Sequence, residues 1–395
     1  MDATASGRSL SRHSLWTIAA LSALTILRCQ LGGAQTQPTI HEFTIAPNSQ
    51  ARAIVAGADG QLWFTESNSN RIGRMTVSGV VTEFDVPTPA AGVAAIAAGT
   101  DGNLWFTEHS TSRIGRITPT GAIDEFILPS RDSGPTGITA GFDNALWFTE
   151  TSANQIGRIT LNGEIVEYTI PTPGCAAMGI ASGFDGTLWF TEAAANQIGR
   201  VTLLGMITEH PVPTADSMPV AITAGADGSL WFTEQSAAQI GFVTLGGSVG
   251  ELISLAAQSA PFGITTGADH DIWFTESGSN RLGRISAEGS ITEFAVPTAN
   301  SAPSGITTGV DGNVWFTELT GDRVGRVGLS GPVCFGDCNG DGTVTIDELT
   351  ALVNAVFEDV GLASCPLGDA DGDEAIGVSD LVTAVSNALN GCPAS

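Results

Sequence analysis

The stretch Leu104-Trp105-Phe106-Thr107-Glu108 decides the fold, because it recurs with at most one change at a fixed spacing. Seven copies occur, and consecutive copies are 42 residues apart. A fixed period of this length indicates one repeated supersecondary unit, too small to bury its apolar face without its neighbours. The tryptophans that mark the copies are Trp63, Trp105, Trp147, Trp189, Trp231, Trp273 and Trp315.

Each period contains four strand-sized pieces separated by turn-rich sequence. In the unit around Trp105 the predicted strands are 94–98, 104–108, 114–118 and 123–126. Four antiparallel strands in about 40 residues, repeated radially, are typical of a β-propeller blade. We therefore predict an all-β seven-bladed β-propeller over residues 35–333.

The two ends of the repeat array predict how the ring closes. The seventh repeat stops after its third strand, at 324–328, and lacks the fourth-strand motif. That motif occurs instead near the N-terminus, as Ile40-His41-Glu42-Phe43. We expect this segment to complete the last blade, so that no blade keeps an open edge.

The repeated glutamates allow two interpretations. With a four-residue turn at 67–70, Glu66 lies opposite Arg71, and every repeat supplies Arg or Gln there as a cross-strand partner. The same register puts Gly73 opposite a Phe ring and Arg74 over the Trp, as a cation–π contact needs. The alternative is a catalytic or metal-binding carboxylate ring. We prefer the pairing for all seven: Glu66, Glu108, Glu150, Glu192, Glu234, Glu276 and Glu318.

The first residues have the pattern of an export signal. Basic residues precede the apolar run 15–27, and small residues follow at 32–34. This pattern predicts a signal peptide over 1–34 and a secreted protein, extracellular or periplasmic. We expect no lipid anchor at Cys29, because Arg28 fits a lipobox poorly. No other stretch approaches the ~18 apolar residues that a membrane span needs.

The charge balance excludes some partners. The predicted propeller holds 29 acidic residues and 12 arginines, and the 62 residues after it hold 11 acidic residues and no basic one. The chain contains no lysine, and its net charge is −26. Such a surface repels nucleic acid and anionic lipid. We expect neither as a partner, and we expect a monomer.

The segment 334–395 carries two acidic loops with calcium-site spacing. Oxygen ligands recur at loop positions 1, 3, 5, 7 and 12, and the first loop has glycine at position 6. The second loop has Glu374 in place of that glycine and the shorter Asp at position 12, so it should bind more weakly. We predict two Ca²⁺ ions. Their ligands would be Asp337, Asn339, Asp341, Thr343 and Glu348, and then Asp369, Asp371, Asp373, Ala375 and Asp380.

An amphipathic helix follows each loop, and turn-like sequence precedes it. Paired loop-plus-exit-helix units resemble type I dockerins, over about residues 334–392. The resemblance implies calcium binding and a protein partner, such as a cohesin-like receptor. The sequence departs from the dockerin pattern at 346–347 and 378–379, where dockerins usually carry hydroxyl residues that contact the partner.

Four of the cysteines after the signal peptide lie in this C-terminal segment. Four cysteines in a short exported module predict two disulfides, with three possible connectivities. A pseudo-twofold arrangement of the loop–helix units favours Cys334 with Cys392 and Cys338 with Cys365. Cys175, in the propeller, is then odd and should be free or buried.

The string Asp-Gly-x-Leu-Trp-Phe-Thr-Glu followed by Asn-x-Ile-Gly-Arg-Ile-Thr resembles the virginiamycin B lyase, or streptogramin lyase, family. Residues 101–118 and 291–298 show the pattern well, and the resemblance covers 40–330. It implies a seven-bladed propeller that opens a cyclic depsipeptide by Mg²⁺-assisted elimination. The family's functional histidines begin strand one of the blade. The corresponding residues here are Arg52, Ala94, Thr136, Met178, Val220, Phe262 and Ser304.

None of these seven residues is a histidine, and elimination needs a base with a pKa near 7. We therefore nominate no catalytic residue and predict a secreted binding or display protein with a calcium-binding attachment module. The alternative is a lyase of the streptogramin type with Mg²⁺. His109, at a strand end, should be an exposed turn residue. An unknown ligand of the propeller should meet side chains that converge at one channel mouth, namely Arg52, Arg131, Met178, Met218 and Phe262.

Overall fold

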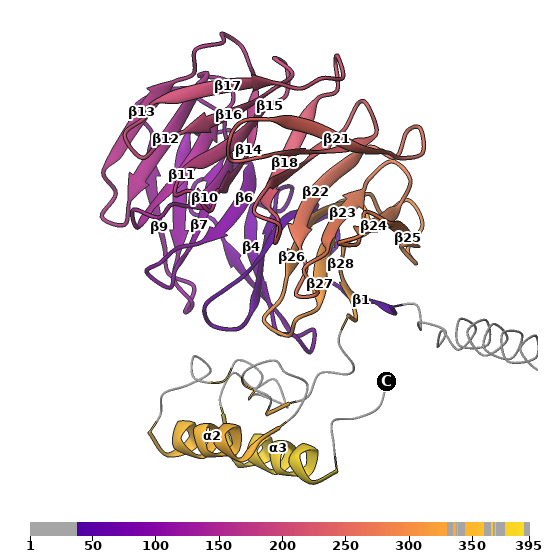
Figure 1. Ribbon diagram of the computed structural model, residues 1–395. Coiled ribbons are helices and arrows are strands. Elements are labelled where there is room, and N and C mark those ends of the chain that lie inside the picture. The colour runs from indigo at the N-terminus through magenta and orange to yellow at the C-terminus, as the bar shows by residue number, and fades with distance from the viewer. Residues whose placement is uncertain are drawn as a thin grey trace, which may run out of the picture. The chain divides into compact units, whose positions relative to one another are not determined.

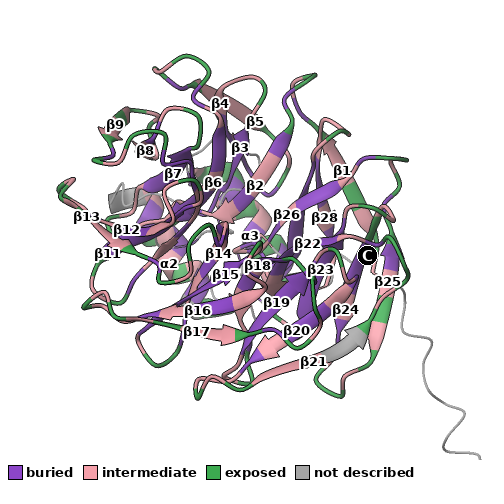
Figure 2. Cartoon of the chain, turned by 90° about the horizontal axis from the view of Figure 1, so that it is seen from above, coloured by how far each residue is buried: buried purple, intermediate pink, exposed green. Residues whose placement is uncertain are grey.

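The computed structural model describes residues 38–329, 335–336, 338, 344–358, 365, 368 and 376–390. Its strands form seven four-stranded antiparallel sheets arranged around a central axis (Figure 1; Figure 2). The strand that opens each 42-residue repeat faces the axis, as the view along it shows (Figure 2). The predicted all-β seven-bladed propeller is confirmed.

The blade around Trp105 has the four predicted strands, with ends shifted by at most one residue. They are β6 (Val93–Ala98), β7 (Leu104–Glu108), β8 (Arg113–Ile117) and β9 (Ile123–Ile127). The five other blades with consecutive strands contain β2 (Ala51–Ala56), β3 (Leu62–Glu66), β4 (Arg71–Met75), β5 (Val81–Asp85), β10 (Pro135–Ala140), β11 (Ala145–Glu150), β12 (Gln155–Thr160), β13 (Ile165–Thr169), β14 (Ala177–Ser182), β15 (Leu188–Glu192), β16 (Gln197–Val201), β17 (Ile207–Pro211), β18 (Pro219–Ala224), β19 (Leu230–Glu234), β20 (Gln239–Val243), β21 (Val249–Ser254), β22 (Pro261–Thr266), β23 (Ile272–Glu276), β24 (Arg281–Ile285) and β25 (Ile291–Ala295).

The last blade combines the two ends of the array, as predicted. Its strand order is β1-β28-β27-β26, and the strands are β1 (Ile40–Thr44), β26 (Pro303–Thr308), β27 (Val314–Glu318) and β28 (Arg323–Val327). Glu42 on β1 accepts hydrogen bonds from the backbone N–H and the hydroxyl of Thr298, both at 2.8 Å. Glu125 binds Thr88 in the same way, at 2.9 and 2.7 Å. Ring closure therefore uses a contact that also joins other neighbouring blades.

The core of each blade is built from the repeated aromatic residues. In the β6–β9 blade, Trp105 is fully buried and stacks on Phe126, with ring centroids 5.5 Å apart. The guanidinium of Arg116 lies 5.5 Å from the centre of the Trp105 ring. A Cβ at Gly115 would collide with the ring of Phe106. The predicted cation–π contact and the need for glycine are both confirmed.

The predicted ion pair between Glu66 and Arg71 is wrong, although the two residues do lie opposite each other in the ladder. Arg71 instead forms an ion pair with Glu83 on the fourth strand, at 2.7 Å. Glu66 accepts a hydrogen bond from the hydroxyl of Ser69, at 2.6 Å. The arginine reaches outward because Glu83 lies near solvent, whereas Glu66 is completely buried.

Two helices follow the propeller sequence, α2 (Ile346–Glu358) and α3 (Val378–Asn390). Their contact is centred on Leu352 and Ala384, both fully buried. Several apolar side chains of the two helices are exposed instead, namely Ile346, Val378, Val382 and Leu389. No helix in the described parts of the chain is long and apolar enough to cross a membrane.

A disulfide joins Cys338 to Cys365, with an S–S distance of 2.10 Å. This is one of the two bonds favoured from the sequence. The other predicted pair, Cys334 with Cys392, lies outside the described residues. Structural disulfides persist in oxidising compartments, which agrees with an exported protein.

Candidate functional site

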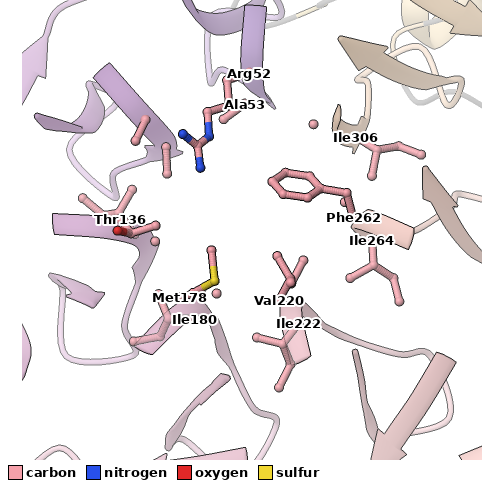
Figure 3. Close-up of a pocket in the computed structure, with 18 of the residues that line it drawn as sticks. Arg52, Ala53, Thr136, Met178, Ile180, Val220, Ile222, Phe262, Ile264 and Ile306 are labelled. Carbon is pink, nitrogen blue, oxygen red and sulfur yellow. The ribbon is translucent and has the colours of Figure 1, made fainter. Parts of the chain in front are cut away.

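The first strand of every blade contains an irregularity next to the channel. In β10, Pro135 pairs with Glu150 and Ile138 pairs with Phe148, so Thr136 and Gly137 share the place of one residue. Such a bulge re-aims a side chain, and bulges are common beside binding sites. Figure 3 shows the side chain of Thr136 at the wall of the central cavity.

The threonine of the repeated stretch holds this bulge and joins it to the next blade. Thr149 accepts a hydrogen bond from the N–H of Gly137, at 2.9 Å, and donates one to the carbonyl of Met178, at 2.7 Å. Thr317 donates to the carbonyl of Arg52 at 2.9 Å and so completes the circle. The other five bonds run from Thr65 to Ala94, Thr107 to Thr136, Thr191 to Val220, Thr233 to Phe262 and Thr275 to Ser304.

Sequence reasoning missed this role of threonine. The available signal was that Thr recurs in all seven copies at a position where any β-former would suit a buried strand. Its hydroxyl is needed because a bulge leaves a backbone N–H without a ladder partner, and a buried unpaired N–H is costly. The seven bonds also tie the carbonyl of a bulge residue, such as Met178, to the preceding blade.

The residues at the seven bulges surround a cavity of about 240 Å³ on the propeller axis (Figure 3). Its wall contains one charged side chain, one hydroxyl and otherwise apolar groups. Isoleucines two residues further along the same strands complete the lining, for example Ile138 and Ile222. The bulge residues that line the cavity are Arg52, Ala94, Thr136, Met178, Val220 and Phe262, and the seventh, Ser304, is buried beside them.

Arg52 is the cationic group of this cavity. Figure 3 shows its guanidinium extending from the wall toward the axis. Burial lowers the pKa of Arg52, and no carboxylate of the described chain offsets that effect. A guanidinium stays protonated in proteins, so the cavity contains a positive charge.

Only part of the predicted ligand-binding set converges. Arg52, Met178 and Phe262 line the cavity together, as expected. Arg131 and Met218 do not line this cavity, and both are exposed. Both precede the first strand of their blade in the connecting turn, so the bulge does not direct them inward.

His109 lies closer to the cavity than its place in a turn suggests. It is exposed, as predicted, and its Nδ1 lies 3.3 Å from the hydroxyl of Thr136. That hydroxyl is also 2.7 Å from the hydroxyl of Thr151. Among the other described histidines, His41 is exposed on β1, His210 stacks on a tryptophan, and neither they nor His270 line the cavity.

The seven repeated glutamates are fully buried and take no part in the cavity lining. Burial raises the pKa of Glu150 to about 7 and that of Glu192 to about 8. The carboxylate oxygens of these two residues make no hydrogen bond within the described chain. The described part of the chain contains no group of three His, Cys, Asp or Glu side chains that could hold a metal ion.

Cys175 lies near one of these glutamates, Glu192. It is fully buried, and it occupies the position that is serine in five other repeats, for example Ser133 and Ser217. Burial raises the pKa of its thiol to about 12, and the nearby Glu192 adds to the shift. The thiol is therefore a small packing group and is unreactive.

Two of the predicted calcium ligands lie within the described residues, and each caps the helix that follows its loop. Glu348 accepts hydrogen bonds from the N–H groups of Cys338, at 2.9 Å, and Thr345, at 2.7 Å. Asp380 accepts one from the N–H of Gly377, at 2.7 Å. Each carboxylate is buried at the third helical position, as in a capping box. The other predicted ligands lie outside the described residues: Asp337, Asn339, Asp341, Thr343, Asp369, Asp371, Asp373 and Ala375.

Comparisons with known proteins agree with this architecture. A solved structure named streptogramin B lyase is 40% identical, with a TM-score of 0.72, and the match covers 74% of this chain and 98% of that one. Virginiamycin B lyase from Staphylococcus aureus is 38% identical, with a TM-score of 0.71 and coverage of 74% and 100%. A structure of a catalytically inactive histidine-to-alanine variant of that enzyme, with quinupristin, matches equally well.

More distant structures share the fold alone. The extracellular domain of a putative hybrid two-component system from B. thetaiotaomicron is 13% identical, with a TM-score of 0.58, over 72% of this chain and 41% of that one. No curated protein sequence matches the chain. The profile described as the Virginiamycin B lyase family matches residues 15–270 and 248–336. The chain therefore belongs to the virginiamycin B lyase family.

Proposed function

We propose that this chain is an exported binding protein whose axial cavity takes a small ligand and whose C-terminal segment attaches it elsewhere. The observation that carries the proposal is the identity of the bulge residues. They supply one guanidinium, one threonine hydroxyl and apolar groups, so the cavity wall itself offers no base near neutral pH. A mostly apolar cavity with few polar groups is typical of ligand-binding sites.

A lyase of the streptogramin type is the second candidate, because the chain belongs to that family. One geometric observation favours it. His109 contacts Thr136 at the cavity wall, so its imidazole could serve as a base for a substrate held there. A histidine is the usual base for such a proton transfer, since its pKa lies near neutral pH.

Quinupristin with Mg²⁺ discriminates the two candidates. Intramolecular elimination opens the ring without changing the mass, so liquid chromatography with fragment-ion mass spectrometry should be used to detect the linear isomer. The solved streptogramin B lyase serves as a positive control. We expect no linear isomer from this chain. If the wild type opens the ring and the His109→Ala variant does not, the binding proposal is wrong and the chain is a lyase.

We also propose that the C-terminal segment binds two Ca²⁺ ions and docks on a protein partner. The support is the ligand spacing of the two loops together with the matched positions of Glu348 and Asp380. Isothermal titration of chelator-treated full-length protein should show two sites of unequal affinity. Asp337→Ala should remove the tighter site and Asp369→Ala the weaker one. Heat-neutral titrations with no gain in thermal stability would contradict calcium binding.

A further inference from the structure

The guanidinium of Arg52 is a half-buried charge at the cavity wall, without a side-chain partner among the described residues. No ion pair or side-chain hydrogen bond of Arg52 occurs within the described parts of the chain, and desolvation is the one influence on its pKa. Among the arginines at other places in the repeat, Arg71 and Arg158 each form an ion pair with an acidic residue, at 2.7 Å. Buried charges in proteins are normally paired or bound to a ligand.

The residues around Arg52 leave space beside its guanidinium. On the two neighbouring blades, the equivalent bulge positions carry the small residues Ala94 and Ser304. Met178 and Val220 lie across the cavity from Arg52, and Phe262 extends its ring toward the axis from one flank (Figure 3). The cavity therefore has a cationic side with room for a head group and an apolar side.

We propose that the axial cavity binds a small amphipathic monocarboxylate, with its carboxylate on the Arg52 guanidinium and its apolar body against Met178, Val220 and Phe262. This inference rests on the proposed binding function and adds the chemical class of the ligand. A planar guanidinium can hold a carboxylate through two parallel hydrogen bonds. The hydroxyl of Thr136, which lies at the same wall, is a further polar group within the cavity.

Charge and volume set the limits of the ligand class. The cavity of about 240 Å³ is smaller than the ~300–1,000 Å³ typical of sites for drug-sized molecules, so the apolar body is short. The net charge of −26 repels polyanions at long range, and one guanidinium compensates one negative charge. A single carboxylate on a small aryl or alkyl group fits both limits.

The experiment uses 3-phenylpropionate as the probe and its neutral amide, 3-phenylpropanamide, as the matched ligand. Binding to the full-length protein is measured by isothermal titration calorimetry and by ligand-observed NMR. The variant is Arg52→Met, which keeps a long side chain and removes the charge. The control variant is Arg131→Met, which changes the net charge equally at an exposed arginine outside the cavity. Circular dichroism and melting temperatures verify that both variants fold.

We expect the carboxylate to bind the wild type and Arg131→Met equally, and to bind Arg52→Met at least ~10-fold more weakly, as for a lost charged hydrogen bond. The amide should bind the wild type and both variants with the same low affinity. Equal binding of acid and amide, independent of Arg52, would overturn the anion site and leave the binding function standing. Absence of any binding of the acid would also overturn the proposal. Linearisation of quinupristin by the wild type would refute the binding function instead.

Discussion

Glu192→Gln is expected to weaken the pH dependence of the propeller's stability. Burial, together with the nearby charge of Glu209, raises the pKa of Glu192 from 4.5 to about 8. Below pH 4.5 the carboxyl is neutral in both folded and unfolded chains. Between 4.5 and about 8 the unfolded chain loses the proton while the folded chain keeps it, so the free energy of unfolding falls as pH rises.

The magnitude follows from the size of this pKa shift. Each pH unit of the interval from 4.5 to about 8 corresponds to about 1.4 kcal/mol, so one such group destabilises the fold by up to roughly 5 kcal/mol above pH 8. Glutamine cannot ionise and has nearly the same shape. The stability of Glu192→Gln relative to the wild type should therefore increase by up to that amount between pH 5 and pH 9.

Urea unfolding at unit pH steps from 5 to 9, followed by tryptophan fluorescence, measures this difference. Glu164→Gln is the matched control, because Glu164 is exposed in a turn and its substitution changes the net charge equally. The control should follow the wild type at every pH. Parallel stability profiles for Glu192→Gln and the wild type would refute the claim that this carboxyl is protonated in the folded propeller at neutral pH.

Three other substitutions test the contacts between and within blades. Glu42→Ala removes both hydrogen bonds to Thr298 and should lower the free energy of unfolding by roughly 2–3 kcal/mol in urea titrations; an unchanged midpoint would contradict this role in ring closure. Gly115→Ala forces a Cβ against Phe106 and should cost at least ~3 kcal/mol or prevent soluble expression, and wild-type stability would contradict the steric argument. Arg116→Met should cost about 1 kcal/mol through the lost cation–π contact and the lost ion pair with Asp124, and a neutral effect would assign the stabilisation to the aliphatic stem.

The repeat period predicted the fold and the closure almost completely, for a physical reason. A blade has few ways to bury a Trp and a Phe at fixed spacing against its neighbours. The closing strand around Glu42 was recognisable because it carries the same motif as the other fourth strands.

Side-chain partners were harder to predict than strand pairs. Glu66 and Arg71 are opposite each other in the ladder, yet the arginine pairs with Glu83 on the next strand. A register gives Cα neighbours, whereas the choice between two carboxylates depends on how deeply each is buried. The cavity wall was predicted only in part. Arg52 lies at a bulge and points into the cavity, whereas Arg131 lies in a turn outside it. The alternation of residues along a β-strand does not show where a bulge will form.

The pairing of β1 with β28 makes the seventh blade dependent on an intact chain. Thr44 and Arg323, neighbours in that ladder, are 279 residues apart in the sequence. Contacts of such long range form late in folding, because the closure entropy of the intervening chain opposes them. Proteolytic loss of β1 would leave three strands in that blade, and loss of β28 would leave β1 without its ladder partner. The presence of a complete seventh blade thus reports that both ends of the ring have been made and retained.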